Sequence, residues 1–288
     1  MTTKNELYAQ SLIETGSSFT MDASLDRFNA RLRVDDYRGS VRLMHTRILA
    51  LANEHALTKI FIKSRPEDVA TLLGLGYMLE GVFKKYFNGG DAYSMAMYLS
   101  DERRTSEYWI QEDDILRQVL SLPLKASDEP LAQGYTIRIA VTEDAEQLAH
   151  LYGTVFQTYP TPMNDPAYIK KVMLEGTVFY VAEAEARIVS AASAEINAIY
   201  NNAEMTDCAT YNEHRKHGLM RHLITALENE LQTRHIYCAY SLARSLSFGM
   251  NAVFHQLGYE YAGRMTKNCN IFDKLEDMSL WVKDLSRC

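Results

Sequence analysis

The sequence predicts an α+β fold on three observations. Short strand-like runs recur along the chain, and one of them ends at Thr210. Longer stretches carry apolar residues at helical spacing, most clearly after Gly218. After residue 134 the elements have the order β-α-α-β-β-β-α-β-α-β-β, with one crossover helix after the fourth strand. The composition, 47% hydrophobic and 23% charged over 288 residues, is that of a globular protein with one large domain or two ordinary ones.

A polar segment from Leu124 to Gly134 marks the predicted domain boundary. It contains Pro130 and Gly134, and it separates two regions that each look able to fold. We therefore predict an N-terminal α/β domain, residues 1–126, and a second domain, residues 134–288.

The second domain is expected to open with a strand at 134–140 and two helices. The first helix is predicted to begin with Thr142 as its N-cap, and the second has Pro166 at its first position and Gly176 at its end. The elements expected after them are strands at 177–183, 187–199, 201–210, 235–240, 259–267 and 278–285, and helices at 219–231 and 250–258.

The helix after Gly218 has the most regular pattern. Its apolar residues recur every three or four positions, with polar residues on the other side, so we expect it to pack on a sheet. These apolar residues are Leu219, Met220, Leu223, Ile224, Leu227 and Leu231.

The N-terminal region repeats part of this order. From Arg31 onward it reads strand, short Arg/Gly turn, amphipathic helix, strand, short helix, Leu-Gly-Tyr and strand, as the last part of the chain does. One interpretation is a degenerate copy of the C-terminal half-fold. The other is that any β-α-β-α-β unit ending in glycine has this appearance.

Composition excludes several classes of function. A net charge of −7 argues against sequence-independent nucleic-acid binding, which needs a basic face. No apolar run reaches the ~20 residues that cross a bilayer, and the N-terminus has no apolar export signal, so we expect a cytoplasmic protein without membrane contact. The four cysteines lack C-x-x-C spacing and the eight histidines lack H-x-x-x-H spacing with partner acids, so no metal is expected.

Arg215, Lys216, His217 and Gly218 stand at the entrance of the regular helix. A helix N-terminus has unpaired amide groups and partial positive charge, and a glycine turn lets those amides converge on a phosphate. The loop is therefore a candidate pyrophosphate site. It has neither the G-K-[ST] of a Walker A loop nor a G-x-G-x-x-G fingerprint. A basic turn of this kind is also common on a solvated surface.

Together with its context, the loop resembles the phosphate loop of the GNAT superfamily of acyl-CoA-dependent N-acyltransferases, Q/R-x-x-G-x-G/A. Here it reads Arg215-x-x-Gly218-x-Met220, with Met in place of a small residue. The resemblance covers residues 134–288. It implies a mixed, mostly antiparallel sheet flanked by helices, splayed between strands four and five, and acetyl-CoA as cosubstrate.

Three stretches of sequence are similar to the β-lysine N-acetyltransferase family. They are "NAEMTDCATYNEHRKHGL", "GMNAVFHQLGYEYAGRMTKNCNI" and, in the first half, "YFNGGDAYSMAMYLSDER". The resemblance implies transfer of acetyl to the ε-amine of β-lysine, giving a compatible solute, and functional pairing with a lysine 2,3-aminomutase. Another amine, such as a polyamine, lysine or a protein, and a non-catalytic acyl-CoA sensor are the alternatives. A homodimer is possible.

The superfamily resemblance also implies a set of site residues. Strand residues would line the pantetheine arm with main-chain groups, the loop would bind the pyrophosphate, and the next helix would flank the thioester. In that order, the expected cofactor residues are Cys208, Ala209 and Thr210; Arg215, Lys216, His217, Gly218, Leu219 and Met220; and Asn251 and Phe254.

Acetylation of an amine needs a proton acceptor, because a lysine-like amine with a pKa of ~10.4 is almost entirely protonated near pH 7. We favour Glu204 as acceptor and Asp207 as a structural or ammonium-holding acid, with the direct attack needing no covalent intermediate. Three residues apart, they share a face of the strand only if a bulge intervenes. Tyr159 and Glu195 are candidate substrate contacts.

Two further points concern the leaving thiolate and the alternative chemistry. Phe254 stands where many relatives have a proton-donating Tyr, so a general acid stays unassigned, with Tyr259, Tyr240 and water as options. Cys208 near His217 or His214 is a weaker option as a covalent nucleophile.

Overall fold

The computed structural model describes residues 8–125 and 129–287, so part of the predicted linker lies outside the described residues. In the first half the elements are β1 (Ala9–Thr15), β2 (Phe19–Asp26), β3 (Arg31–Gly39), α1 (Val41–Glu54), β4 (Lys59–Ser64), α2 (Val69–Gly74), β5 (Met78–Phe87), β6 (Gly90–Tyr98), α3 (Asp101–Arg104) and α4 (Trp109–Leu120). In the second half they are β7 (Thr136–Ile139), α5 (Ala145–Val155), α6 (Pro166–Leu174), β8 (Val178–Ala184), β9 (Arg187–Asn197), β10 (Asn202–Thr210), α7 (Leu219–Thr233), β11 (Cys238–Arg244), α8 (Phe248–Gln256), β12 (Glu260–Ile271) and β13 (Lys274–Asp284).

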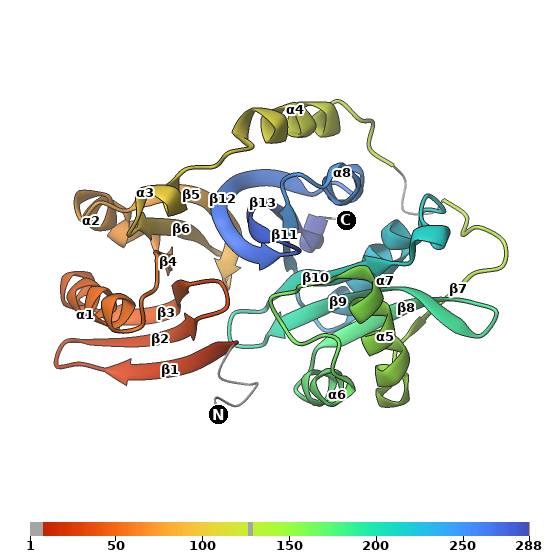
Figure 1. Ribbon diagram of the computed structural model, residues 1–288, viewed down its shortest axis with the longest axis horizontal. Helices are drawn as coiled ribbons and strands as arrows, with labels where there is room; N and C mark the ends of the chain where they lie inside the picture. The colour runs from red at the N-terminus through yellow and green to blue at the C-terminus, as the bar shows by residue number, and fades with distance from the viewer. Residues whose placement is uncertain (1–7, 126–128, 288) are drawn as a thin grey trace.

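These strands form one mixed sheet with the order β1-β2-β3-β4-β6-β5-β12-β13-β11-β10-β9-β8-β7. Among the described strands, β3–β4 and β10–β11 pair in parallel and the other neighbours are antiparallel. The sheet is therefore mostly antiparallel, as predicted, and it runs through both halves of the chain (Figure 1).

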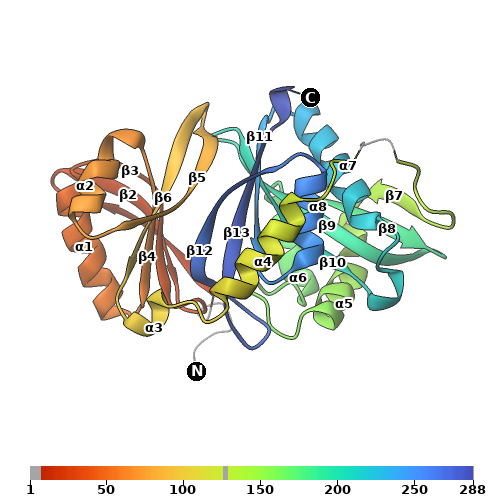
Figure 2. The ribbon, with the colours of Figure 1, turned by 90° about the horizontal axis from the view of Figure 1, so that it is seen from above.

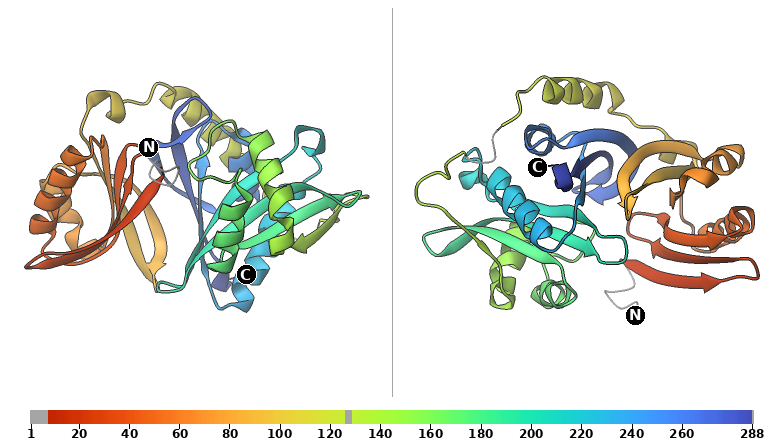
Figure 3. Two further views of the ribbon diagram at one scale, coloured as in Figure 1. Left: turned by 60° about the horizontal axis from the view of Figure 1, so that its bottom comes forward. Right: turned by 180° about the vertical axis from the view of Figure 1, so that it is seen from behind.

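The C-terminal half has helices on both faces of its sheet. Figure 3 shows α5 and α6 on one face and α7 on the other. The central strand β9 is accordingly buried from Ile188 to Ala194 without the alternation of a half-exposed strand. The regular apolar stripe of α7 forms part of this core, as its spacing predicts.

The two halves meet where β5 lies beside β12. Gly81 and Gly263 pair at this contact, and a Cβ on Gly263 would lie 2.1 Å from the carbonyl oxygen of Glu80. Two glycines are thus required for the backbones to approach so closely. A mixed apolar cluster, including Phe83 from the first half and Leu280 from the second, fills the space beside the contact.

Helix α4 belongs by packing with the second half, although it precedes the predicted boundary. It lies against α8 in Figures 1 and 2, and the amide of Lys125 donates to the carbonyl oxygen of Gln256 at 2.9 Å. The imidazole of His255 contacts the carbonyl oxygen of Leu122 at 3.0 Å. The domain boundary at residue 126 stays a prediction. By its packing, the chain joins the second half before Trp109, where α4 begins.

Two local predictions need correction or extension. Thr142 is not the N-cap of α5: a 3₁₀ turn, Thr142–Asp144, precedes the helix, and the Asp144 carboxylate accepts from the amide of Val141 at 2.8 Å. This bond satisfies the amide before the turn, as the acid of a capping box does, and it is not the cap that Thr142 was expected to provide. Strands β12 and β13 also extend well beyond their predicted ends, because the hairpin continues past two irregularities in register.

Candidate active site

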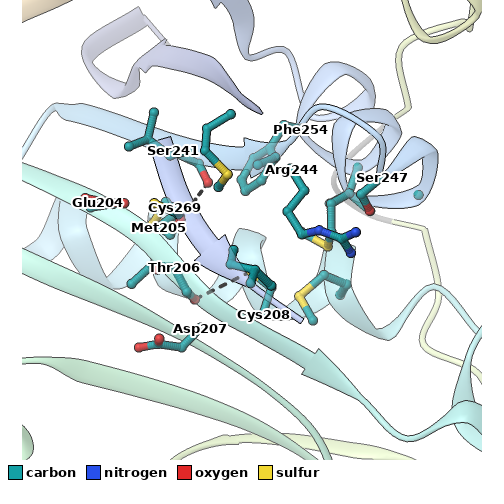
Figure 4. A pocket seen from close by; sticks show the side chains of 18 of the residues that line it. Glu204, Met205, Thr206, Asp207, Cys208, Ser241, Arg244, Ser247, Phe254 and Cys269 are labelled. Atoms are coloured by element: carbon teal, nitrogen blue, oxygen red, sulfur yellow. Dashed lines mark hydrogen bonds between the residues drawn. The ribbon is translucent and has the colours of Figure 1, made fainter. Parts of the chain in front are cut away.

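A splay between two parallel strands forms the first part of the site. β10 and β11 pair only over their first three residues, ending at Glu204 opposite Tyr240. Just beyond, the hydroxyl of Ser241 donates to the carbonyl oxygen of Met205 at 2.7 Å, and the strands then diverge. Figure 4 shows the residues of β10 on one side of the opening, with Ser241 and Arg244 on the other. Backbone groups of β10 in this opening are available to an extended ligand.

Asp207 lies in a β-bulge of β10. The pairing with β9 shifts register between Thr206 and Ala209, and Asp207 has a φ of +49°. Asp tolerates this left-handed conformation better than most residues. The bulge breaks the strand alternation, so the side chains of Glu204 and Asp207 both line one cavity. This is the condition under which the two predicted acids can act together.

The loop before α7 presents unpaired amides. Lys216 and Gly218 have φ of +69° and +73°, and no side chain caps the helix at Gly218. Among the described residues, no acceptor faces the backbone amides from Lys216 to Met220. Such donors at a helix N-terminus, with Arg215 and Lys216 beside them, suit a diphosphate.

One cavity of about 760 Å³ connects the loop, the splay and the N-terminal half. Its volume is within the usual range for small-molecule sites. Most of the predicted site residues line it: Tyr159, Glu195, Glu204, Asp207, Cys208, Thr210, Arg215, Lys216, Gly218, Leu219, Met220 and Phe254.

Three predicted residues lie elsewhere. Asn251 is 2% exposed; its Oδ1 accepts from the indole of Trp281 at 2.7 Å and its amide nitrogen donates to the carbonyl oxygen of Arg244 at 2.9 Å. It therefore holds α8 against β11 and β13, and its side chain does not line the cavity in which we expected it to flank the thioester. The side chain of Ala209 is buried in the pairing with β9, and its predicted main-chain contact with the pantetheine arm stays a prediction. His217 packs against the ring of Tyr135, so its side chain does not line the cavity.

The carboxylates of the cavity form a cluster on neighbouring strands. Glu195 on β9 lies directly opposite Glu204 on β10, and the Asp207 carboxylate accepts a hydrogen bond from the hydroxyl of Ser193 at 2.6 Å. Loss of hydration, with the nearby charges of Asp207 and Glu204, raises the pKa of Glu195 to about 8. Burial raises the pKa of Asp207 to about 6. It also raises the pKa of Glu204, against the attraction of nearby cations. Acids with such pKa values can exchange protons near neutral pH.

The structure limits which residues can protonate the leaving thiolate and which can act as a nucleophile. Phe254 packs edge-on against Tyr259, whose side chain contacts Glu228 and does not line the cavity. Tyr240 does line it, and burial keeps its pKa well above the usual value, so its hydroxyl is a proton donor. Burial likewise holds the pKa of the Cys208 thiol well above its ordinary value, which disfavours a thiolate nucleophile.

The residues that the N-terminal half contributes were not predicted from the sequence. Arg33 and Lys63 line the same cavity as Glu204. The available signal was the alternation of charged and apolar residues in "RLRVDD" and "KIFIK", which puts the charges of each strand on one face. That these faces close an active site results only from the arrangement of the two halves.

Comparisons with known proteins agree with this geometry. Residues 136–262 match the family model for an acetyltransferase (GNAT) domain. The chain is 42% identical over 262 residues to the N-acetyltransferase YodP of Bacillus subtilis, covering 90% of this chain and 94% of the relative. It is 33% identical over 270 residues to the β-lysine N(6)-acetyltransferase of Methanosarcina mazei, covering 87% of this chain and 100% of the relative. The enzyme of the same name in Methanococcus maripaludis is 33% identical over 81% of this chain and 85% of its own length.

The domain match and the splayed strands beside an amide-rich loop define an acetyl-CoA-dependent N-acetyltransferase of the GNAT class. Similarity over nearly the whole of two relatives makes the assignment narrower. The chain belongs to the β-lysine N-acetyltransferase family within the GNAT superfamily. Among residues 8–125 and 129–287, no helix combines the length and apolar character that a membrane crossing requires.

Proposed function

We propose that the enzyme transfers the acetyl group of acetyl-CoA to the ε-amine of β-lysine, giving Nε-acetyl-β-lysine. The observation that carries the proposal is a carboxylate cluster, Glu195, Glu204 and Asp207, at the end of the splay in a cavity that the N-terminal half also lines. A cavity of this size with walls from both halves suits a small diamino acid better than a protein chain. The family relatives that carry the same activity in their names support it.

The carboxylates have two tasks in this proposal. At neutral pH only about one lysine-like amine in a few thousand is uncharged, so the site has to bind an ammonium and remove its proton. Asp207 holds the ammonium as a carboxylate, the mostly protonated Glu195 accepts a hydrogen bond from it through its carbonyl oxygen, and Glu204 accepts the proton directly or through water. A raised pKa makes Glu204 a more effective acceptor than an exposed carboxylate would be.

The strand and the loop position the acyl donor. When bound, acetyl-CoA supplies a thioester carbonyl that the neutral amine can attack. The amides of the loop before α7 bind its diphosphate, and the open side of β10 binds the pantetheine arm. Amide groups of β10 beyond Glu204, where the strand no longer pairs with β11, would serve as donors to the carbonyl oxygen as it gains negative charge. The amine attacks directly, since the Cys208 thiol stays protonated.

Tyr240 is our candidate for protonating the thiolate, in place of Phe254. Its hydroxyl lies at the cavity wall beside Glu204, which it contacts. In the cell, a lysine 2,3-aminomutase would supply β-lysine, and the product would serve as a compatible solute.

Acetylation of other amines is the competing hypothesis, because one relative is named only as an N-acetyltransferase. A mass-detected panel decides between them: purified enzyme, acetyl-CoA, and β-lysine, lysine, ornithine or spermidine as acceptor. We expect the highest kcat/KM for β-lysine, with fragmentation placing the acetyl group on the ε-nitrogen. A higher value for spermidine or lysine contradicts the proposal. CoA binding by calorimetry without turnover of any amine indicates a sensor.

A further inference from the structure

The polar face of β3 and β4 points toward the C-terminal half. Alternate residues of these strands, Leu32 and Val34 on β3 and Ile60 and Ile62 on β4, are buried in the core beneath α1. The opposite face carries a row of charged side chains, of which Arg31, Lys59 and Lys63 are at most 7% exposed. Burying charge in this way is unfavourable unless each group has a partner or a ligand.

Two of these cations, Arg31 and Lys59, bind protein groups and link the two halves. The Arg31 guanidinium donates to the Asp26 carboxylate at 2.8 Å and to the carbonyl oxygen of Asn268 at 2.9 Å. The Lys59 ammonium donates to Glu80 and to the carbonyl oxygen of Thr266, both at 2.8 Å. Their roles are structural.

The next two cations in the row, Arg33 and Lys63, share a single carboxylate partner. Arg33 Nε and Lys63 Nζ share one carboxylate, that of Asp35, at 2.9 and 2.6 Å. Among the described residues, the terminal nitrogens of Arg33 have no hydrogen-bond acceptor. The Arg33 side chain is 37% exposed and lines the cavity. Asp35 is therefore the one direct ion-pair partner of these two cations among the described residues, with Asp22 farther off on β2, and two guanidinium donors of Arg33 are directed to no protein group.

Neighbouring rings fix the position of the second cation. The Lys63 ammonium lies 4.8 Å from the ring centroid of Tyr86 and 5.8 Å from that of Phe83. It is nearly buried, so Asp35 and the rings hold it in place. Arg33 is thereby left as the group that can bind a ligand.

Across the cavity the charge is opposite. The carboxyl groups of Glu195, Glu204 and Asp207 have no ion-pair partner within 4 Å in the part of the chain that the structure describes. The charge of Glu204 helps to raise the pKa of Arg33, so the two groups sense each other across the space. A cavity with a cationic wall on one side and carboxylates on the other matches a molecule with a carboxylate at one end and an ammonium at the other.

We propose that Arg33, supported by Lys63, binds the carboxylate of the acceptor, so that the N-terminal half selects an amino acid over a simple diamine. This inference rests on the proposed function. With the carboxylate held by β3, the amine farther from it reaches Glu204 and the thioester. The same contact therefore directs acetylation to the ε-nitrogen of β-lysine and away from the β-nitrogen. Removal of the contact weakens acceptor binding and leaves the CoA site intact. Loss of the Arg33 charge also raises the pKa of Glu204, and this effect is the same for every acceptor.

The test compares two acceptors that differ only in the carboxylate. These are β-lysine and 1,4-diaminopentane, which is β-lysine without its carboxyl group. We expect the wild-type enzyme to favour β-lysine by about 10- to 100-fold in kcat/KM, the usual effect of a charge-assisted hydrogen bond. Arg33→Gln should lower kcat/KM for β-lysine by about that factor more than for 1,4-diaminopentane, so the preference disappears.

Two further variants serve as controls. Arg38→Gln removes a cation of the same strand whose exposed side chain pairs with Asp36 and does not line the cavity, and it should leave the preference unchanged. Arg33→Lys keeps the charge but loses the planar pair of donors, so it should retain part of the preference. Melting temperatures and calorimetric CoA binding confirm that each variant is folded.

The outcomes separate this inference from the proposed function. If β-lysine is the preferred acceptor and Arg33→Gln lowers kcat/KM equally for both amines, the carboxylate site is wrong and the proposed function stands. If the wild-type enzyme acetylates polyamines better than any amino acid, both are overturned. If the Arg33→Gln enzyme acetylates β-lysine on either nitrogen while the wild type modifies one, the positioning role is confirmed.

Discussion

The two halves of the molecule have the same strand order and differ in how the first strand of the parallel pair connects to its helix. In the first half the order is β2-β3-β4-β6-β5, and in the second it is β9-β10-β11-β13-β12. In each, the second and third strands named are the parallel pair, joined by one long helix. Arg33 opposite Phe61 and Glu204 opposite Tyr240 then occupy corresponding positions, so the common frame puts opposite charges on the two walls of the cavity.

The connection to the helix differs between the two halves: one entrance is capped by its own chain, and the other is open to the diphosphate. Ser40 alone joins β3 to α1, and its hydroxyl accepts from the amide of Leu43 at 3.4 Å. Residues 211–218 join β10 to α7, and no side chain caps that helix. A short, capped connection has satisfied its amides, whereas a long, uncapped one leaves them for a ligand. The two halves share the arrangement of strands, and the longer loop of the second half adds the diphosphate site.

The largest effect is expected at the C-terminal wall, from Glu204→Gln. Loss of the proton acceptor should lower kcat by about 10²- to 10⁴-fold, while calorimetric CoA binding stays unchanged because the loop before α7 is intact. Glu146→Gln, an exposed change on α5, is the matched control and should be silent. Turnover at the wild-type rate would remove Glu204 from its role.

The next largest effect is expected at the contact between the two halves. Gly263→Ala puts a Cβ 2.1 Å from a backbone oxygen of β5, so we expect a loss of about 3 kcal/mol or more in the free energy of unfolding. Gly89→Ala is the control: its φ is +98°, but nothing lies within 4 Å of the added carbon. It should cost about 1 kcal/mol. Urea denaturation measures both losses in the free energy of unfolding. If the two losses are equal, the loss at Gly263 comes from backbone strain alone and not from the clash with β5.

Local patterns were sufficient to predict much of the C-terminal half. The stripe of α7, the Pro166 start of α6 and the glycine at the α7 entrance depend on neighbours in sequence, and the structure confirms them. The splay after Glu204 could be expected only through the family resemblance. Asn251 was misplaced because a resemblance fixes the position of a helix, whereas burial against Trp281 is a matter of packing.

The bulge and the second wall were beyond the reach of sequence patterns. The spacing of Glu204 and Asp207 admits both a regular strand and a bulge, and the choice depends on pairing with β9. Arg33 comes from a strand that lies far earlier in the chain, and its position at the cavity results from the docking of the halves through Gly81 and Gly263. Such long-range geometry leaves only a weak trace in one sequence.

One buried acid from each half should respond to pH in opposite ways. Burial raises the pKa of Asp207 to about 6, whereas Arg33 and Lys63 outweigh burial at Asp35 and hold its pKa well below the ordinary value. The folded state thus favours a proton on Asp207, and this contribution to stability is lost as pH rises from about 4 to about 6. At Asp35 the contribution is present above about pH 4 and is lost as pH falls.

Asp207→Asn should therefore gain stability relative to the wild type between pH 4 and pH 7, by roughly 1–3 kcal/mol. Asn also tolerates the left-handed backbone of the bulge. Asp35→Asn should show the opposite trend, with its greatest loss at neutral pH. Chemical denaturation between about pH 4 and pH 7 gives the slope for Asp207→Asn, and a second series between about pH 2 and pH 5 gives the slope for Asp35→Asn. A loss of stability in Asp35→Asn that does not shrink as pH falls below about 4 would contradict the contrast.

The smallest effects test the two helix entrances directly. Ser40→Ala removes the cap of α1 and should lower stability by about 1 kcal/mol without changing KM for acetyl-CoA, because that entrance binds only its own chain. Arg215→Gln should do the reverse: its exposed guanidinium donates to the carbonyl oxygen of Thr210 at 3.2 Å and stands at the diphosphate end of the cavity. We expect KM for acetyl-CoA to rise about 3- to 10-fold, the range for one exposed cation at a phosphate, with little change in melting temperature. The effect of Arg215→Gln should shrink at high salt. If the rise in KM is the same at high salt, Arg215 does not act on the diphosphate through its charge. If Ser40→Ala changes KM for acetyl-CoA, the α1 entrance is not purely structural. Either result would contradict the division of roles that the caps of the two helices indicate.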